Sequence, residues 1–229
     1  MTKRIRSKNY QKASVSVSSE KKEVTLTEAV ELAKKGSYAK FKASLELHLN
    51  LNIDPKKTDQ KINFTTTLPF STGKTKRVVV ITNPEKQSEA EKAGADEVGG
   101  KELIERIAQG WLGFDALVAS PDMMSELASV ARILGPKGLM PNPKNGTVSM
   151  DVATAVGNLK KGQMTIKMGD DPALHLVVGN DEQKTAEVVA NIEHIMTLLN
   201  ANRPAKLKGN LIKSAFLAPT MGPSFKLAL

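Results

Sequence analysis

The amino-acid sequence predicts an α/β protein of two domains, in which an α/β domain is inserted into an α+β domain built from both chain ends. The middle of the chain alternates short, wholly apolar runs with helical segments, which is typical of βαβ units around a parallel sheet. Both ends instead carry strands in which apolar and polar residues alternate, a pattern typical of a sheet with one face in solvent. The 229 residues are enough for two such domains.

Composition and charge indicate an anionic partner. The chain has 33 Lys and Arg against 24 Asp and Glu, a formal net charge of +9, which favours binding to nucleic acid. It contains no cysteine, which excludes disulfides, zinc fingers and thiol catalysis. Its first residues, MTKRIRSKNYQK, lack the apolar segment of a secretory signal, and no stretch has the roughly 18 apolar residues of a membrane span. We therefore expect neither export nor a membrane partner.

The N-terminal part begins with a basic arm. Residues 1–12 contain five basic residues and no acid, so we expect an arm that stays mobile until it meets a polyanion. The five basic residues are Lys3, Arg4, Arg6, Lys8 and Lys12. Residues 13–19, ASVSVSS, are expected to form a linker.

The next segments predict a helix and two strands. Residues 25–36 carry an apolar stripe at helical spacing, with Thr25 or Thr27 as the N-cap and a glycine at the end. Residues 44–52, SLELHLNLN, alternate leucine with polar residues, which predicts a half-buried strand. Residues 62–69 predict a second strand, and we expect the two strands to pair in an antiparallel sheet.

Residues 71 to 162 show the pattern of a parallel α/β sheet. Two buried strands with short apolar runs are expected at residues 77–82 and 114–120, with a short strand or turn at residues 96–100. The segments expected to be helices are residues 83–94, 101–110, 121–135 and 150–162. Strands that alternate with helices in this way favour βαβ units.

After residue 162 the first pattern returns. Strands are expected at residues 163–168 and 174–179, around a turn at residues 169–173. An amphipathic helix over residues 181–204 and a strand–turn–strand over residues 210–229 complete the chain. The predicted domains are therefore residues 1–70 with 163–229, and residues 71–162.

The excess positive charge is unevenly divided between the two predicted domains. The insertion has 12 basic and 11 acidic residues, a net charge of +1, whereas the remainder has 21 and 13, a net charge of +8. We therefore expect the domain built from both chain ends to bind most of any polyanion.

A nucleotide-dependent enzyme that uses the α/β insertion is the alternative interpretation, and the motifs argue against it. The stretch STGKT resembles the end of a P-loop, but Leu68 stands where the motif requires a glycine, and the stretch precedes a strand instead of opening a helix. No G-x-G-x-x-G follows a strand. The three histidines have no second ligand at metal spacing in the sequence, and we expect them at surface or strand-pairing positions; they are His48, His175 and His194. We expect no catalytic residue, no cofactor and no metal.

One unusual loop covers residues 133–148, ILGPKGLMPNPKNGTV. It holds three glycines, three prolines and the two lysines Lys137 and Lys144. Glycine lets a backbone approach phosphates closely, whereas proline stiffens it, so the loop fits a phosphate cradle, a rigid corner or a partner surface. Because it lies in the nearly neutral insertion, we interpret it as a rigid corner.

A second unusual loop covers residues 219–224, PTMGPS. It places Met221 between two strands, where a hairpin ordinarily needs only a short polar turn. Flat packing against a sugar or a base edge would account for this methionine. Lys40 and Phe41, before the alternating strand, suit either the core or a base-stacking surface beside a phosphate.

Taken in order, these stretches resemble the family of the large-subunit ribosomal protein L-one, the protein of the mobile stalk beside the ribosome's exit site. ILGPKGLMPNPKNGTV resembles the family's signature, and further matches are LNIDPKKTDQ, AEKAGADEVGG, GWLGFDALVASPDMM and TMGPS. The resemblance covers roughly Thr25 to Lys226. The residues of the stretches LNIDP, ASPDMM and LMPNPK favour the bacterial and plastid branch.

The resemblance implies a fold and a function. It implies a split α+β domain of two layers and an inserted Rossmann-like α/β domain of three layers. It also implies a structural constituent of the large ribosomal subunit that binds the rRNA stalk, helps release deacylated tRNA from the exit site and represses translation of its own mRNA. We accordingly expect no enzyme activity, a monomer when free, and a bacterial cytoplasmic ribosome or an organellar one, in a plastid more than in a mitochondrion.

The resemblance also implies the RNA-binding residues. They are Lys40, Phe41, Glu46, Thr220, Met221, Gly222 and Ser224. Secondary RNA contacts are expected from Lys8, Lys137 and Lys144. Two features depart from the family pattern: Pro219 stands where a hydroxyl residue is usual, and Gly169 to Asp171 put acid in a turn that is usually basic or polar.

Overall fold

A computed structural model describes residues 7–15, 23–54, 61–169, 171–204, 207 and 209–228. The chain divides into two compact units, here called the terminal unit (residues 1–63, 68–73 and 166–229) and the inserted unit (residues 64–67 and 74–165). The charged residues of the insertion all fall in the inserted unit, so the net charges of +8 and +1 belong to these two units. The domain bounds predicted from the sequence, residues 1–70 with 163–229 and residues 71–162, remain a proposal.

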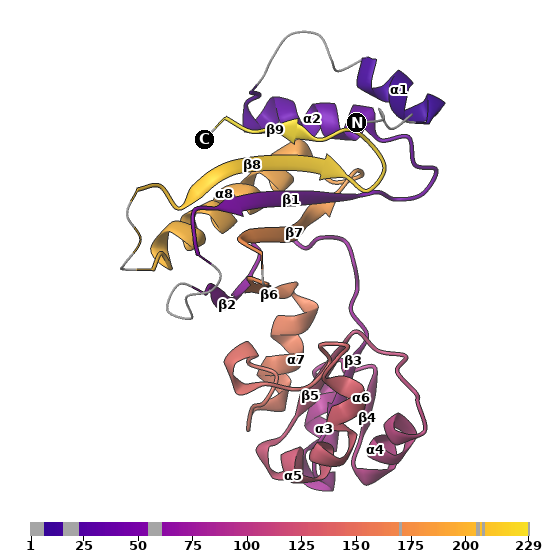
Figure 1. The fold of residues 1–229 in the computed structure, drawn as a ribbon. Helices are drawn as coiled ribbons and strands as arrows, with labels where there is room; N and C mark the ends of the chain where they lie inside the picture. The colour runs from indigo at the N-terminus through magenta and orange to yellow at the C-terminus, as the bar shows by residue number, and fades with distance from the viewer. Residues whose placement is uncertain are drawn as a thin grey trace. The chain divides into compact units, whose positions relative to one another are not determined.

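The terminal unit contains a four-stranded antiparallel sheet in the order β7-β1-β8-β9 (Figure 1). Its elements are α1 (Lys8–Val15), α2 (Leu26–Gly36), β1 (Ser44–Leu51), β7 (Ala173–Asn180), α8 (Thr185–Ala201), β8 (Ile212–Pro219) and β9 (Phe225–Lys226). Val24 also forms a parallel bridge with Leu227. Segments near both ends of the chain therefore build one sheet.

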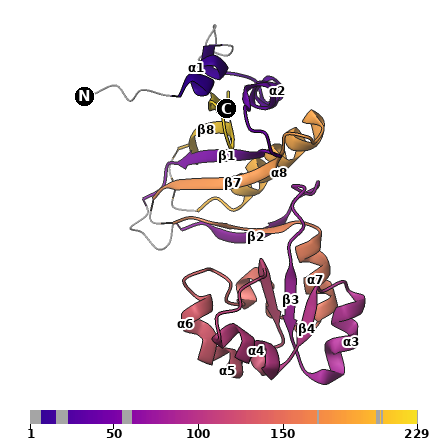
Figure 2. The ribbon, with the colours of Figure 1, turned by 90° about the vertical axis from the view of Figure 1, so that its right-hand side faces the viewer.

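The alternating leucines of β1 bury one face of this sheet. Leu45, Leu47 and Leu49 are at most 1% exposed, and in β8 Leu217 and Ala215 lie on the same buried face. Helix α2 packs against β8 and β9, and α8 packs against β7. Figure 2 shows α8 on one side of β1 and β7. The two layers and the predicted strand pattern are thus confirmed for this sheet.

The opposite side of the sheet, here called the open face, carries half-buried and exposed side chains. It is defined by the outward residues of the four strands: Glu46, His48, Asn50, Ala173, His175, Val177, Ser214, Phe216, Ala218 and Lys226. None of these ten residues is fully buried.

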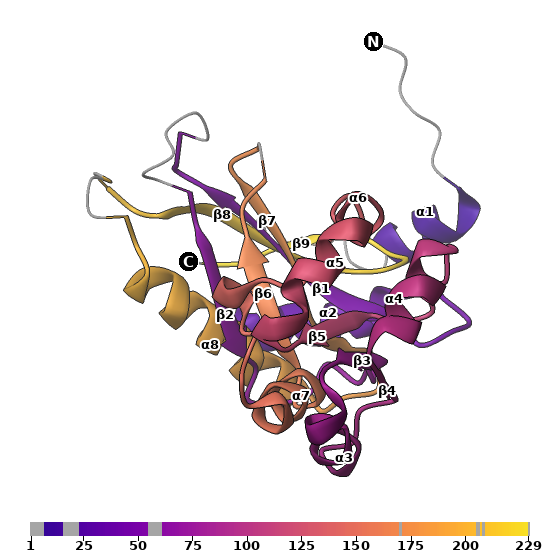
Figure 3. The ribbon, with the colours of Figure 1, turned by 90° about the horizontal axis from the view of Figure 1, so that it is seen from below.

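The inserted unit is built around a three-stranded parallel sheet in the order β4-β3-β5. Its strands are β3 (Val78–Ile81), β4 (Glu97–Gly99) and β5 (Ala116–Ala119), and its helices are α3 (Pro84–Lys92), α4 (Lys101–Ala108), α5 (Met124–Leu127), α6 (Ala131–Leu134) and α7 (Val152–Lys160). Figures 2 and 3 show α3 and α7 on one side of the sheet and α4, α5 and α6 on the other. Two hydrophobic clusters fill the spaces between these three layers.

The first pairing expected in the sequence is wrong. Strand β2 (Asn63–Thr67) does not pair with β1; it forms a separate two-stranded sheet with β6 (Gln163–Lys167), whereas β1 pairs with β7 and β8. Leu45, Leu47 and Leu49 of β1 already have antiparallel neighbours in both β7 and β8, so no edge of β1 remains for β2. Strands β1 and β2 are close in the sequence, but they do not pair.

Two local expectations also need correction. The basic arm was expected to be mobile, but Lys8 to Val15 form α1; residues 1–6 lie outside the described part of the chain. The single helix expected over residues 121–135 is a series of short α and 3₁₀ turns. Its buried residues still recur every three or four positions, at Met123, Leu127, Val130 and Leu134, so the apolar stripe is right although the hydrogen bonding is irregular.

The cap of α2 differs in detail from the expectation. Thr25 is the N-cap residue, but its side chain makes no capping hydrogen bond, and the helix ends with Gly36 as its last residue. Gly36 is buried, and a Cβ there would lie 3.3 Å from the Pro223 ring. The end of α2 is therefore fixed by close packing as well as by helix-ending chemistry.

A buried asparagine holds the chain where it leaves the terminal unit. Asn191 of α8 is 0% exposed, and its Oδ1 accepts a hydrogen bond from Phe70 N at 3.0 Å. Its Nδ2 donates to Phe70 O at 3.1 Å and to Val178 O at 2.8 Å. Because all polar atoms of this side chain are paired, Asn191 works as a clamp on the backbone of Phe70.

Candidate nucleic-acid interface

The structure brings together two segments that are distant in the sequence: the Phe41 segment (residues 37–43) and the Met221 loop (residues 220–224). Tyr38 N donates a hydrogen bond to Met221 O at 3.3 Å. Phe41 is 58% exposed and Met221 is 42% exposed, which makes them two of the exposed large hydrophobic side chains of the chain. Two exposed apolar groups on neighbouring segments form a surface suited to packing against flat rings.

Thr220 fixes the Met221 loop to β1. Its Oγ1 accepts a hydrogen bond from Ser44 N at 3.0 Å and donates to Ser44 O at 3.1 Å, while Thr220 N donates to the same carbonyl at 2.9 Å. The hydroxyl therefore already acts both as a hydrogen-bond donor and as an acceptor within the protein. Thr220 therefore positions the loop, and its direct contact with RNA stays a prediction of the resemblance.

Gly222 lies where no side chain fits. A Cβ at this position would be 2.6 Å from Pro219 Cγ and 2.8 Å from Gly36 O, and the second of these is a backbone atom that cannot turn away. Pro223 in turn packs against Gly36, so the loop sits directly on the end of α2. The glycine is required by close approach, since its backbone φ is not in the left-handed region.

The remaining predicted residues of the main interface lie in the same terminal unit. Glu46 is half-buried on the open face, between Val177 of β7 and Ala218 of β8. Lys40 and Ser224 are exposed, beside Phe41 and Met221 respectively. The seven predicted residues thus belong to one end of one sheet and its loops.

The three predicted secondary contacts are dispersed. Lys8 is exposed at the start of α1. Lys137 and Lys144 are exposed in the inserted unit, which is a different compact unit from the one that holds Met221.

The structure also pairs two histidines that the sequence left apart. His48 of β1 and His175 of β7 are register partners on the open face, and their Nδ1 atoms are 2.8 Å apart. Their rings meet edge to face, with centroids 5.0 Å apart. Glu46 Oε2 is 3.9 Å from His48 Nε2. Burial and the neighbouring His175 lower the pKa of His48 below its ordinary value, and Glu46 opposes this.

The glycine- and proline-rich loop is held by its own hydrogen bonds. Asn142 N donates to Thr147 Oγ1 at 2.8 Å, Thr147 Oγ1 donates to Asn142 O at 3.1 Å, and Lys144 N donates to Asn142 Oδ1 at 2.9 Å. Backbone N–H groups of Gly138, Asn145 and several neighbours also donate within the loop. A phosphate cradle needs such donors free, so this arrangement favours a rigid corner.

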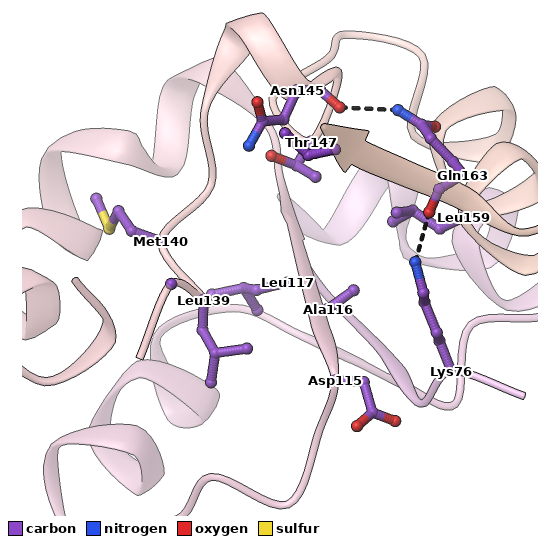
Figure 4. A pocket seen from close by; sticks show the side chains of 12 residues that line it. Lys76, Asp115, Ala116, Leu117, Leu139, Met140, Asn145, Thr147, Leu159 and Gln163 are labelled. Carbon is purple, nitrogen blue, oxygen red and sulfur yellow. Dashed lines mark hydrogen bonds between the residues drawn. The ribbon is translucent and has the colours of Figure 1, made fainter. Parts of the chain in front are cut away.

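One side of this loop lines a small cavity of about 140 Å³ in the inserted unit (Figure 4). Lys76 Nζ donates to Gln163 O at 2.5 Å, and Gln163 Nε2 donates to Asn145 O at 2.9 Å. Burial lowers the pKa of Lys76, and Asp115 opposes this. These hydrogen bonds connect the loop to the start of β6. They give the polar side chains that line the cavity a structural role.

The P-loop-like stretch has the wrong geometry for nucleotides. Gly73 N donates to Ser71 Oγ at 3.2 Å in a tight turn, and β3 follows within a few residues instead of a helix. Among the residues that the structure describes, no group of three or more His, Asp or Glu side chains could hold a metal ion. No helix of the described ranges is long and apolar enough to cross a membrane.

Sequence reasoning missed the contacts that depend on strand register. Ser44 and Tyr38, which hold the Met221 loop, bond to it mainly through their backbones and leave no signal in residue type. The His48–His175 pair joins residues 127 positions apart, and the only sequence signal was that each stands at a polar position of an alternating strand.

The amino-acid sequence matches a family of known proteins. A sequence model described as the Ribosomal protein L1p/L10e family matches residues 33–223. The chain is 44% identical over 217 residues to a protein named large ribosomal subunit protein uL1 from Salinispora arenicola, covering 95% of this chain and 91% of that protein. Proteins of the same name are 44% identical over 224 residues in Limosilactobacillus fermentum (98% of this chain, 97% of that protein) and 46% identical over 222 residues in Thermobifida fusca (95% and 92%).

Proposed function

Because the chain belongs to the Ribosomal protein L1p/L10e family, and within it to the bacterial type, we propose that it is a structural constituent of the large ribosomal subunit that binds large-subunit rRNA. The proposed interface is the Phe41 segment, the Met221 loop and the adjoining end of the open face. We assign this chain no catalytic activity.

One observation carries this proposal: two exposed apolar side chains, Phe41 and Met221, lie on neighbouring segments of the more basic unit. Unpaired bases of RNA loops stack on aromatic side chains such as Phe41, and each such stacking contact contributes about 1–3 kcal/mol. Met221 would add apolar packing beside the stacked base. The net charge of +8 on the same unit supplies the salt-dependent attraction to phosphates. Stacking beside a basic surface suits an internally looped RNA better than a plain duplex.

The polar residues of the interface have separate roles in this proposal. Glu46 cannot attract phosphate, but its carboxylate can accept hydrogen bonds from the amino groups of cytosine or guanine, which would favour particular bases. Lys40, exposed next to Phe41, is suited to a phosphate contact. Thr220 and Gly222 act by holding Met221 in place.

Further parts of the proposed function follow from the family. We propose that the rRNA element is the mobile stalk, that the protein assists release of deacylated tRNA from the exit site, and that it represses translation of its own mRNA through the same surface. The relatives named above are bacterial, which supports a ribosome in the bacterial cytoplasm. The free protein is proposed to be a monomer.

The proposal is tested by equilibrium binding of the full chain to an rRNA stalk fragment and to a scrambled hairpin of the same length. We expect the stalk fragment to bind at least tenfold more tightly at matched salt, because loop bases and not charge alone are recognised. Equal affinities for the two RNAs would show that the surface is merely basic.

A further inference from the structure

The His48–His175 pair lies on the open face, beside the proposed RNA interface, and the proposed function gives it no role. The two Nδ1 atoms are 2.8 Å apart, which is a hydrogen-bond distance. A hydrogen bond between them requires one proton to lie on one Nδ1 and none on the other. The tautomers of the two rings are therefore linked.

Glu46 decides which ring carries which proton. Its Oε2 is 3.9 Å from His48 Nε2, so the carboxylate favours a proton on that nitrogen. His48 Nδ1 must then accept the hydrogen bond, and His175 Nδ1 must donate it. This leaves His175 Nε2 without a proton in the neutral pair.

The neutral pair can therefore take up one proton without breaking its hydrogen bond. Protonation at His175 Nε2 keeps the Nδ1–H···Nδ1 contact and places a positive charge on His175, the exposed member of the pair. A second proton would have to enter between the two Nδ1 atoms and would set two like charges against each other. The geometry limits the pair to a single added charge.

Most side chains around the pair on the open face are uncharged, so few carboxylates would repel an anion bound beside His175. The outward neighbours on β7 and β8 are uncharged, namely Ala173, Val177, Ser214 and Phe216. Glu46 is the carboxylate beside the pair on β1, with Asn50 as the uncharged neighbour on the other side. On β9, Lys226 occupies the position paired with Phe216, and its Nζ is 2.8 Å from Glu23 Oε1.

We propose that the His48–His175 pair is a proton-linked phosphate contact, which takes up one proton when RNA occupies the open face. This inference rests on the proposed function. A phosphodiester near His175 stabilises the protonated pair, because it adds a negative charge beside His175, whereas Glu46 lies beside His48. By linkage, RNA affinity then rises as pH falls through the range in which the bound pair is protonated and the free pair is not.

The test measures binding of the rRNA stalk fragment to the full chain from pH 8 to pH 6, at constant ionic strength and with EDTA. Uptake of one proton raises the affinity tenfold for each pH unit, so uptake close to one proton predicts an affinity about 10- to 100-fold higher at pH 6 than at pH 8. His48→Gln with His175→Gln should make the affinity nearly independent of pH, close to the wild-type value at pH 8. The chain has one other histidine, so His194→Gln is the matched control and should keep the wild-type slope.

Calorimetry in two buffers of different ionisation enthalpy gives a second readout. It should report uptake of close to one proton by the wild type and by His194→Gln, and almost none by the double variant. Tight binding that is independent of pH, or a slope that survives in the double variant, would overturn this inference alone. Failure to bind the stalk fragment at every pH would overturn the proposed function and this inference with it.

Discussion

Met221 gives the clearest link between one residue and the proposed function. Met221 is 42% exposed at the end of a hairpin, so the core covers it only in part. Its loop is nevertheless held in a single position by three backbone and hydroxyl contacts with Ser44 and one with Tyr38. Ordering a loop costs conformational entropy, which RNA binding would otherwise have to supply. Under the proposed function, the loop is therefore already ordered before it binds RNA.

Gly222 gives a prediction about stability. Gly222→Ala places a Cβ against Gly36 O and Pro219, so we expect the terminal unit to lose about 1–3 kcal/mol, as overpacked sites do. Urea unfolding followed by far-UV circular dichroism measures this loss. The single tryptophan, Trp111, lies in the inserted unit, and its fluorescence provides an internal reference.

The matched control for this change is Gly169→Ala in the same unit. A Cβ at Gly169 meets nothing within 4 Å, and its φ is not in the left-handed region. Its effect should stay within about 0.5 kcal/mol. Equal effects of the two substitutions would mean that the close approach at Gly222 does not constrain the loop.

Among the secondary-structure elements, α8 has a role beyond covering the sheet, because its Asn191 clamps the Phe70 backbone. Asn191→Leu keeps the branching at Cγ but leaves three backbone groups without their partner, and we expect a loss of about 2–4 kcal/mol. Denaturant unfolding measures this, and amide exchange at Phe70 should accelerate. Asn202→Ala is the control, since its side chain makes one exposed hydrogen bond within the end of α8. A clamp with no energetic role would give both variants the same stability.

The elements were more predictable from the sequence than their partners. The leucine alternation of β1 and the apolar runs of β3 and β5 identified strands, because the buried positions of a strand hold apolar residues. Strand neighbours are set by long-range register, which residue type does not record. For that reason, the sequence did not predict that β2 pairs with β6 instead of with β1. Helix α1 was missed because its short segment has few apolar residues.

For the molecule as a whole, the uneven charge was visible in the sequence, and the division into units preserves it. Twenty-one basic and 13 acidic residues fall in the terminal unit, against 12 and 11 in the inserted unit. Residue type and position singled out Lys40, Phe41 and Met221, and the family resemblance supplied the full set of candidate interface residues. No residue pattern alone would have joined Phe41 to Met221. Their proximity depends on a sheet whose strands come from both ends of the chain.

The central claim is that the surface around Met221 recognises the RNA, and that the positive charge alone does not. The most direct measurement is the affinity of the stalk fragment across a salt series for three variants. Met221→Asp should lose at least severalfold in affinity at every salt concentration while keeping its unfolding transition. Met150→Asp introduces the same charge at a methionine that is 69% exposed in the inserted unit, and it should have a much smaller effect.

The third variant neutralises both Lys137 and Lys144 of the inserted unit. It should weaken binding much less than Met221→Asp, and mainly by lowering the dependence of affinity on salt. This order, with Met221→Asp the most damaging, is the result that the proposed interface predicts. Unchanged binding by Met221→Asp, or a larger loss from the two lysines, would contradict it.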